Sequence, residues 1–313
     1  MSLKPDYQMT YTICQGCPAS GKSTWANEEI DKSKSGRIIR VNRDDVRREL
    51  FDFGQWPEYK FTKSKEDKVT DHINSAVRKA AALGKSVIDD NTNLNPKYLK
   101  KTQDFAESLG FKVEFKQFFD VPLHKLIERN LYRKYSVGED VVHRMFRAQL
   151  KLQDRIIKST EGLPECVIVD VDGTIADMGK GEKWGRMPYD WGKVSNDKPK
   201  KNVVDFVRFL YATDGIQIIF LTGRDGCALS STRGWIINHI FKGWDVFNEK
   251  YGPELYIRTA GDMRPDCDIK EEILRNKVLP RYNVKFCLDD RNQMVDHWRA
   301  LGLECWQVDA GRF

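Results

Sequence analysis

Residues 16–24 read GCPASGKST and match the pattern G-x-x-x-x-G-K-[ST]. The run lies between a predicted strand, residues 9–15, and a predicted helix, residues 22–31, which is the context of a phosphate-binding loop. Its glycines let backbone N–H groups curl around phosphate oxygens, and the helix adds its positive N-terminal end. We expect ATP here, with Lys22 on the β- and γ-phosphates and the Ser23 hydroxyl on Mg²⁺. The candidate nucleotide-binding residues are Gly16, Cys17, Pro18, Ala19, Ser20, Gly21, Lys22, Ser23 and Thr24.

Around this loop, short apolar runs alternate with longer amphipathic segments. Strands are predicted at residues 9–15, 37–41, 86–89 and 112–119. Helices are predicted at residues 22–31, 44–50, 64–83, 96–109, 122–134 and 139–157. This alternation is typical of a parallel sheet flanked by helices.

A second domain of the same class is predicted after the turn-forming run STEGLP, residues 159–164. Strands are expected at residues 166–169, 217–221, 284–288 and 304–308, with helices between them and an irregular insertion at residues 177–201. A chain of 313 residues suits two domains. We therefore predict an α/β protein with a P-loop domain at residues 1–158 and a second α/β domain at residues 163–313.

Charge and composition narrow the class of protein. Residues 1–158 hold 30 Lys and Arg against 22 Asp and Glu, whereas the remainder holds 22 against 24. A basic N-terminal half suits a polyanionic partner, although solvated helix faces carry similar charge in many soluble proteins.

No apolar run reaches the length of about 18 residues that a membrane span needs, and the start lacks a signal-peptide pattern, so we expect a cytosolic protein without a membrane partner. The 7 cysteines are scattered, and Cys14 and Cys17 have no second pair to complete a zinc site.

Acidic and basic residues follow the second predicted strand in the run NRDDVR, residues 42–47. A carboxylate at the C-terminal end of a parallel strand lies at the rim where ligands bind, so Asp44 is a candidate general base. Arg47, one helical turn later, could hold an acceptor phosphate. The alternative is that Asp44 or Asp45 merely caps the helix. Arg133 is a candidate lid arginine on the donor phosphates, or an ordinary cation at a helix C-terminus.

In the second domain, DVDGT (residues 170–174) closes the first predicted strand. Asp170 could attack phosphorus, and Asp172 could protonate the leaving oxygen and then activate water. Three later runs fit the same chemistry: TGR at residues 222–224, Lys270 in DCDIK, and the pair Asp289–Asp290 after a strand. The acidic residues are candidate Mg²⁺ ligands, because an anion attacking a phosphate needs a metal.

These C-terminal runs resemble the haloacid dehalogenase superfamily of phosphotransferases. The complete order of motifs resembles the polynucleotide kinase/3′-phosphatases of bacteriophages, over nearly the whole chain. The motifs are GCPASGKSTWA, NRDDVR, TNLNP, DVDGT, TGR, DDR and ECWQV.

The resemblance implies transfer of the ATP γ-phosphate to 5′-hydroxyl ends of RNA or DNA, and removal of 3′-phosphates through an aspartyl-phosphate. The fold it implies is a P-loop kinase domain followed by a haloacid dehalogenase-like Rossmannoid domain. It also implies a homotetramer that repairs broken RNA or DNA in the cytoplasm of an infected host. The implied catalytic residues are Lys22, Asp44, Arg133, Asp170, Asp172 and Lys270. The implied substrate-binding residues are Arg47, Thr92, Arg186, Thr222, Gly223, Arg224 and Asp266. The implied metal ligands are Ser23, Asp170, Asp172, Asp289 and Asp290.

The family pattern has Asp where this sequence has Asn91, beside Thr92. Two other readings remain open at this point. The chain could join a P-loop kinase for sugars or nucleosides to a small-molecule phosphatase, or it could be a non-enzymatic ATP-binding scaffold. A ligase is not indicated, because no K-x-D-G run is present.

Overall fold

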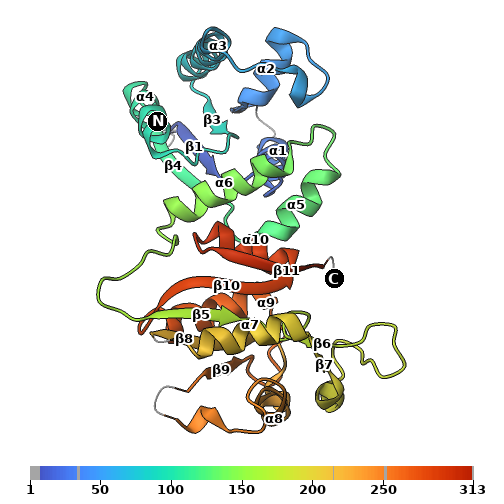
Figure 1. Cartoon of the computed structure of the whole chain (residues 1–313). Coiled ribbons are helices and arrows are strands. Elements are labelled where there is room, and N and C mark those ends of the chain that lie inside the picture. The colour runs from blue at the N-terminus through green and yellow to red at the C-terminus, as the bar shows by residue number, and fades with distance from the viewer. Residues whose placement is uncertain (1–7, 34–35, 214, 250–251, 312–313) are drawn as a thin grey trace, which may run out of the picture. The chain divides into compact units, whose positions relative to one another are not determined.

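The computed structural model describes residues 8–33, 36–213, 215–249 and 252–311. The chain folds as two compact units, Met1–Arg155 and Ile156–Phe313. Each unit has its own parallel sheet with helices packed on it, as Figure 1 shows. The predicted fold class of two parallel α/β domains is therefore confirmed.

In the N-terminal unit, the described strands form one parallel sheet in the order β2-β3-β1-β4. The strands are β1 (Thr10–Gln15), β2 (Ile38–Val41), β3 (Ser86–Asp89) and β4 (Lys112–Gln117). The helices are α1 (Lys22–Lys32), α2 (Arg43–Phe51), α3 (Lys63–Ala82), α4 (Pro96–Ser108), α5 (Leu123–Leu131) and α6 (Glu139–Leu152). Because β1 is central and parallel to β3, the loops after these two strands lie at one edge of the sheet.

Helix α3 covers one face of this sheet through residues at helical spacing. Val69, Ile73 and Val77 are buried against Tyr11 and Ile13 of β1. Burying a branched aliphatic side chain stabilises the fold by about 1.5–3 kcal/mol, so this seam is a main contribution to the unit. It fixes the central strand, and hence the start of the loop that follows it.

In the C-terminal unit, the main described sheet is also parallel, in the order β11-β10-β5-β8-β9. Its strands are β5 (Glu165–Val169), β8 (Ile216–Thr222), β9 (Glu254–Ile257), β10 (Asn283–Arg291) and β11 (Cys305–Gly311). A separate antiparallel pair is formed by β6 (Ala176–Asp177) and β7 (Lys198–Pro199). The helices are α7 (Lys201–Tyr211), α8 (Leu229–His239), α9 (Asp266–Ile273) and α10 (Asn292–Ala300).

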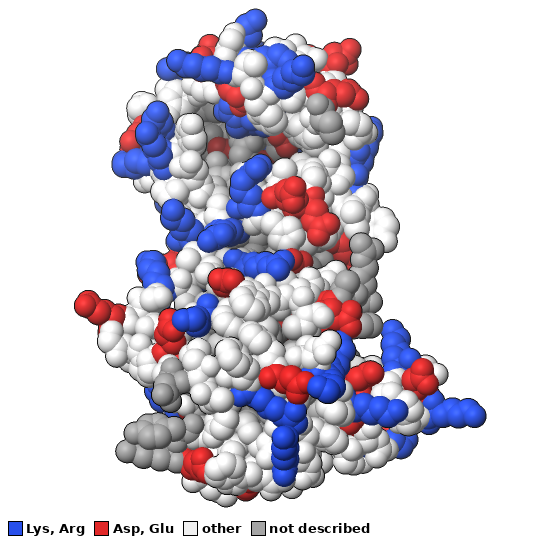
Figure 2. All heavy atoms as spheres, in the orientation of Figure 1, with Lys and Arg blue, Asp and Glu red and all other residues white. Residues whose placement is uncertain are grey.

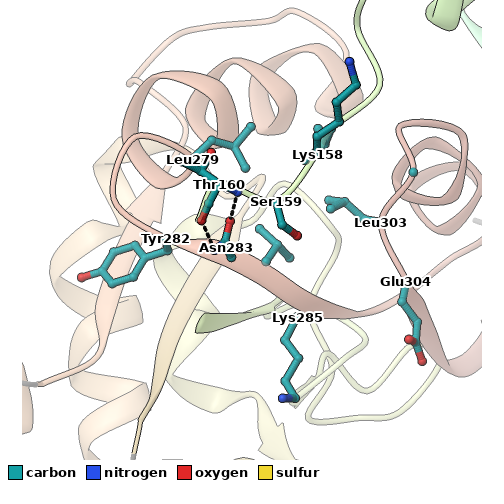
Figure 3. Close-up of a pocket in the computed structure, with 12 residues that line it drawn as sticks. Lys158, Ser159, Thr160, Leu279, Tyr282, Asn283, Lys285, Leu303 and Glu304 are labelled. Carbon is teal, nitrogen blue, oxygen red and sulfur yellow. Dashed lines mark hydrogen bonds between the residues drawn. The ribbon is translucent and has the colours of Figure 1, made fainter. Parts of the chain in front are cut away.

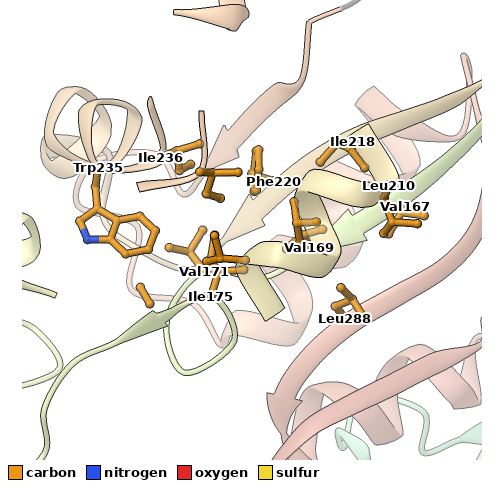
Figure 4. Close-up of a cluster of buried hydrophobic side chains, with 14 of the residues drawn as sticks. Val167, Val169, Val171, Ile175, Leu210, Ile218, Phe220, Trp235, Ile236 and Leu288 are labelled. Atoms are coloured by element: carbon orange, nitrogen blue, oxygen red, sulfur yellow. The ribbon is translucent and has the colours of Figure 1, made fainter. Parts of the chain in front are cut away.

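The core of this unit lies on one face of β5. Val167, Val169 and Val171 alternate along the chain and pack with Phe220 of β8 and Trp235 of α8 (Figure 4). Alternate residues of a strand share a face, so this packing fixes the orientation of β5 and of the residues that follow its C-terminal end. The carboxylates that follow β5 are thus carried by a rigid element.

The elements differ from expectation in several places. The predicted helix at residues 139–157 ends at Leu152, and Asp154 takes a left-handed φ of 51°. The helix predicted at residues 122–134 ends at Leu131, so Arg133 lies in the turn between α5 and α6 rather than in a helix. Strand β9 and the β6–β7 pair were not expected. Within the described residues, no helix is both long and apolar enough to cross a membrane.

Candidate active sites

The phosphate-binding loop is held in a curled shape by backbone contacts. The N–H of Gly16 donates to the carbonyl oxygen of Thr92 over 3.0 Å. A Cβ added at Gly16 would lie 2.9 Å from the carbonyl oxygen of Phe118, so only glycine fits there. Gly21 caps the N-terminus of α1 with a φ of 100°, another conformation that favours glycine. Both glycines therefore stand where a side chain would clash or where the backbone has a positive φ.

Lys22 is folded back over the loop. Its ammonium donates to the carbonyl oxygens of Gly16 over 2.9 Å and of Cys17 over 2.6 Å. Burial lowers the pKa of Lys22 to about 8, an effect that nearby Asp90 partly opposes. The ammonium is thus poorly hydrated and sits at the mouth of the loop, where a phosphate anion would stabilise its charge.

Helix α2 is capped by Asn42 and not by the aspartates that follow it. The Asn42 side chain accepts hydrogen bonds from the N–H groups of Asp44 and Asp45. This contradicts the capping alternative for Asp44. The Asp44 carboxylate instead accepts a hydrogen bond of 2.6 Å from Arg47 and is partly exposed, so it can reach a substrate hydroxyl.

Arg47 is anchored by a second carboxylate on α3. Its guanidinium donates to both oxygens of Glu66, at 2.9 and 2.6 Å, in addition to Asp44. Burial alone would raise the pKa of Glu66, but hydrogen bonds from Arg47 and Arg43 outweigh it and lower this pKa to about 2. Arg47 is therefore held in a defined position beside Asp44, as a bidentate pair allows.

The loop after β3 lies against the phosphate-binding loop. Besides the bond from Gly16 to Thr92, the Asn93 side chain donates to the carbonyl of Cys14. Thr92 is thus brought beside the phosphate-binding loop. The Asn91 side chain donates to Asp89, whose pKa is raised by burial, and accepts from the N–H of Arg43. Asn91 therefore ties the start of α2 to β3.

Asp90 is a site residue that the sequence analysis missed. It is buried at the C-terminal end of β3, and its Oδ2 atom accepts from Arg40 over 2.7 Å. Its Oδ1 atom is buried with no hydrogen-bond partner among the described residues. Such an atom is costly unless something binds it. Asp90 follows a predicted strand, so the argument made for Asp44, that a carboxylate at the C-terminal end of a parallel strand lies where ligands bind, would have identified Asp90 as well.

Arg133 lies close enough to Lys22, Asp44 and Asp90 to affect them electrostatically. Burial lowers the pKa of Arg133, and Asp44 opposes this effect. Within the described part of the chain, no group accepts a hydrogen bond from its guanidinium. The structure thus brings Arg133 near Lys22, and it places Arg133 one residue beyond Tyr132, the C-cap of α5.

In the C-terminal unit, three carboxylates gather where β5 and β10 end. Oxygen atoms of Asp170, Asp289 and Asp290 lie within 4.8 Å of one another, and all three residues are buried. Burial raises the pKa of Asp170 well above its usual value, and it raises that of Asp290 to about 6, with Asp289 adding to both effects. Crowded buried carboxylates of this kind are suited to a divalent cation.

Lys270 of α9 reaches into this group. Its ammonium lies 2.7 Å from Asp170, 3.3 Å from Asp289 and 3.6 Å from Asp266. Burial alone would lower the pKa of Lys270, but the three carboxylates outweigh it, so the pKa is raised and the side chain stays charged. Asp266 follows Pro265 at the start of α9, four residues before Lys270, so both lie on one face of the helix.

The Asp172 carboxylate does not join the three-carboxylate group. Its Oδ1 atom accepts from Arg186 over 2.7 Å and from Arg224 over 2.6 Å. The predicted metal role for its side chain is therefore not supported by the geometry. Both arginines also bind Asp197, which the sequence analysis missed because no motif marks it. Arg186, from the irregular insertion, is thus brought together with Arg224 from the end of β8.

Two glycines let the motifs approach each other closely. A Cβ added at Gly173 would lie 2.0 Å from the Asp290 side chain, and one added at Gly223 would lie 2.0 Å from Asp266. Thr222 is buried, and its hydroxyl accepts from the N–H of Arg224. Arg258, also missed, donates to the carbonyl of Gly223 and so holds this turn.

A cavity of about 240 Å³ in this unit lies away from these residues (Figure 3). It is lined by the start of β10, near Asn283, whereas Asp289 and Asp290 lie near the C-terminal end of that strand. Asn283 bonds the backbone N–H and carbonyl of Thr160 over 2.7 and 2.8 Å. The cavity therefore lies where the chain is anchored before β5, and the group of buried carboxylates is the candidate active site.

Comparison with known proteins assigns each unit separately. Residues 164–313 match the family model of the polynucleotide kinase PNKP phosphatase domain, and residues 12–156 match that of an AAA domain. A curated relative, the putative bifunctional polynucleotide kinase/RNA ligase of Autographa californica nuclear polyhedrosis virus, is 28% identical over 91% of this chain. The chain spans about 40% of the length of that relative.

Solved structures are also similar to the chain. A chain of the Pnkp1/Rnl/Hen1 RNA repair complex is 25% identical, with 100% of both chains covered and a TM-score of 0.44. A second structure of the Pnkp1/Rnl/Hen1 complex gives 26% identity over 99% of this chain and 100% of the other, with a TM-score of 0.43. The N-terminal unit is thus similar to an AAA domain, and the C-terminal unit is similar to the phosphatase domain of the polynucleotide kinase PNKP.

Proposed function

We propose that this protein heals nucleic-acid ends, by phosphorylating 5′-hydroxyl ends of RNA or DNA with ATP and by removing 3′-phosphates. The observation that carries the proposal is the presence, in one chain, of a complete P-loop with the Asp44–Arg47 pair and a Lys270–carboxylate centre inside a polynucleotide kinase phosphatase domain. The relative's name points the same way. The alternative, a kinase and a phosphatase that act on small molecules, does not account for the match of residues 164–313 to the phosphatase domain of a polynucleotide kinase.

In the kinase reaction, Asp44 accepts the proton of the 5′-hydroxyl as its oxygen attacks the γ-phosphorus. The bond from the γ-phosphorus to the β–γ bridging oxygen breaks, and ADP leaves. Lys22 leaves the carbonyls of Gly16 and Cys17 and binds the β- and γ-phosphates, while Arg133 neutralises the charge that develops on the transferred group. The guanidinium of Arg133 has no hydrogen-bond acceptor among the residues that the structure describes, which supports this lid role.

Arg47 and Thr92 serve the acceptor side. Arg47 is the nearest cation to the base Asp44, and a phosphate of the acceptor strand can replace one of its carboxylate partners. Thr92 is fixed beside the phosphate-binding loop through its carbonyl. These contacts support a substrate that carries phosphates next to its reactive hydroxyl.

The kinase site fits Mg²⁺. Ser23 carries its hydroxyl in the first turn of α1. Asp90 offers a buried Oδ1 atom that has no hydrogen-bond partner among the described residues. Both are the hard oxygen donors that Mg²⁺ takes. The ion would neutralise charge on the β- and γ-phosphates.

In the phosphatase reaction, a carboxylate oxygen of Asp170 attacks the phosphorus of the 3′-phosphate, and the bond from phosphorus to the 3′-oxygen breaks. Asp172 gives its proton to that leaving oxygen and later takes a proton from the water that cleaves the aspartyl-phosphate. Lys270 keeps Asp170 oriented through its contact of 2.7 Å. The second step releases inorganic phosphate and restores Asp170.

Arg186 and Arg224 bind the substrate phosphate. In the free protein they share Asp172 and Asp197, so their positions are set before substrate arrives. The Thr222 hydroxyl and the N–H of Gly223 would add hydrogen bonds to the same phosphate, and Asp266, 3.6 Å from the Lys270 ammonium, orients Lys270. Asp170, Asp289 and Asp290 fit a bound Mg²⁺, which would lower the repulsion between Asp170 and an anionic phosphate.

Two variants test the function. With a 5′-hydroxyl, 3′-phosphate oligonucleotide, Lys22→Ala should lower 5′-phosphorylation by several orders of magnitude and spare 3′-dephosphorylation, because it removes the cation that the phosphate-binding loop itself places on the β- and γ-phosphates. Asp170→Asn should abolish 3′-dephosphorylation and spare the kinase. Gel assays with RNA and DNA, with free nucleosides as competitors, measure both activities.

Preference for free nucleosides or sugars would overturn the polynucleotide assignment. Loss of both activities in a folded Asp170→Asn protein would contradict the two independent sites. Homotetramer formation and a role in RNA or DNA repair in a phage-infected cell rest on the resemblance of the motifs. Light scattering of the purified protein checks the first, and end-healing in a nuclease-challenged host checks the second.

A further inference from the structure

The segment between α2 and α3 carries a group of aromatic rings, which we call the aromatic platform: Phe53, Trp56, Tyr59 and Phe61. Tyr59 is buried at the base, with ring centroids 4.9 Å from Phe53 and 4.8 Å from Phe61. Phe61 and Trp56 are nearly parallel, at 13° and 6.3 Å. Phe61 is 63% exposed. The outer ring of the platform is thus open to solvent and supported from below by Tyr59.

Cations surround the platform on the side of the kinase site. The Arg47 guanidinium lies 5.2 Å from the Phe61 ring, and that of Arg48 lies 5.3 Å from the Trp56 ring. The Lys65 ammonium lies 5.0 Å from Tyr59. Aromatic faces interleaved with Arg and Lys are the combination that binds single-stranded nucleic acid, because rings stack on bases while cations follow the phosphates.

The platform is continuous with the acceptor residues. Arg47 contacts Asp44 over 2.6 Å on one side and lies over Phe61 on the other. A strand whose 5′-hydroxyl meets Asp44, and whose first phosphate meets Arg47, would therefore bring a base near the rings. Glu66 anchors both parts, because it accepts from Arg47 and from the Tyr59 hydroxyl.

We infer that the aromatic platform stacks a nucleobase near the 5′ end of the acceptor strand, with Phe61 as its outer ring. This inference rests on the proposed kinase function and deepens it. The platform gives the kinase a preference for nucleic acid over other hydroxyl compounds, independent of base identity because every base has a π-face. It explains why an exposed phenylalanine stands beside a charged acceptor site.

The test uses the full chain and single-stranded oligonucleotides with a 5′-hydroxyl, either with all bases or with the bases of the first nucleotides removed. The wild-type protein should phosphorylate the base-bearing strand with the higher kcat/KM. Phe61→Ala should lower kcat/KM for that strand by about tenfold to hundredfold, the factor for loss of one base–aromatic stack. It should change kcat/KM for the abasic strand little, and Phe61→Trp should restore the preference.

Tyr98→Ala is the matched control, because Tyr98 is also exposed, at 66%, but lies on α4. An unchanged KM for ATP shows that each variant is folded. Equal losses on the two strands, or no loss on either, would overturn the inference and point to a structural or protein-docking role for the rings. Failure to phosphorylate any oligonucleotide would instead overturn the kinase function itself.

Discussion

At the scale of single residues, Lys22 combines a functional charge with a buried position. Its pKa of about 8 in the free protein lies below the usual 10.5, because burial disfavours the ammonium. Below about pH 8 the side chain is charged and can bind phosphate, and above it the charge is lost. We therefore expect kcat/KM for ATP to fall as pH rises through about 8, since this parameter reports groups of the free enzyme. A profile flat to pH 10 would contradict the role of Lys22.

Asp90 gives a second test at this scale. Asp90→Asn keeps the shape of the side chain but replaces a carboxylate oxygen that no described residue satisfies. We expect the Mg²⁺ concentration for half-maximal kinase rate to rise by about tenfold to hundredfold. Arg40, its ion-pair partner, offers the comparison: Arg40→Gln removes the 2.7 Å contact without removing the ligand atom. An effect of equal size in Arg40→Gln would show that the pair acts only through structure.

Residues within contiguous motifs could be predicted from the sequence, because one loop positions them all. Lys22 and Asp170 are of this kind. Asp197 could not be found, because it reaches the site only through Arg186 and Arg224, which come from distant segments. The resemblance implied a metal role for the side chain of Asp172, yet this carboxylate binds two arginines, Arg186 and Arg224. Such competition between partners is set by tertiary packing and has no local signature.

At the scale of elements, the turn after β8 must pass close to the start of α9. Gly223→Ala would place a methyl group 2.0 Å from the Asp266 carboxylate, which would have to move, and Asp266 lies 3.6 Å from the Lys270 ammonium. We expect a loss of 3′-phosphatase activity of at least about a hundredfold, because a displacement of about 1 Å at a reacting centre costs that much. Gly234→Ala is the control, since its helix leaves open space there and alanine favours helix. Full activity in Gly223→Ala would show that the turn is not tightly fixed.

The main strands and helices could be predicted from hydrophobic patterning, because parallel strands are apolar runs buried on both faces. The shortest elements could not. The two-residue strands β6 and β7 are defined by pairing between residues 176–177 and 198–199, which are remote in sequence. Strand β9 is only half-buried at the edge of the sheet, so its pattern is weak. Leu131 ends α5 early, although the residues after it have ordinary helix propensity.

At the scale of the whole molecule, each unit has its own core, so ligands should act on the units separately. A non-hydrolysable ATP analogue with Mg²⁺, at about 100 times its Kd, should raise the melting temperature of the N-terminal unit by about 5–10 °C. It should leave that of the C-terminal unit unchanged. Scanning calorimetry measures both transitions, and Lys22→Ala should remove the shift. A single transition that shifts as one would contradict independent unfolding.

Each unit is also one uninterrupted stretch of chain, Met1–Arg155 and then Ile156–Phe313. Among the described residues, no strand of the first sheet comes from the second half of the sequence. During synthesis, the ribosome therefore delivers every strand of the N-terminal sheet before it begins β5. Since domains fold as units and the N-terminal one comes first, the nucleotide-binding unit can bury its core while the second is still being translated. Its strands can thus pair with one another before a second set of parallel strands emerges to compete with them.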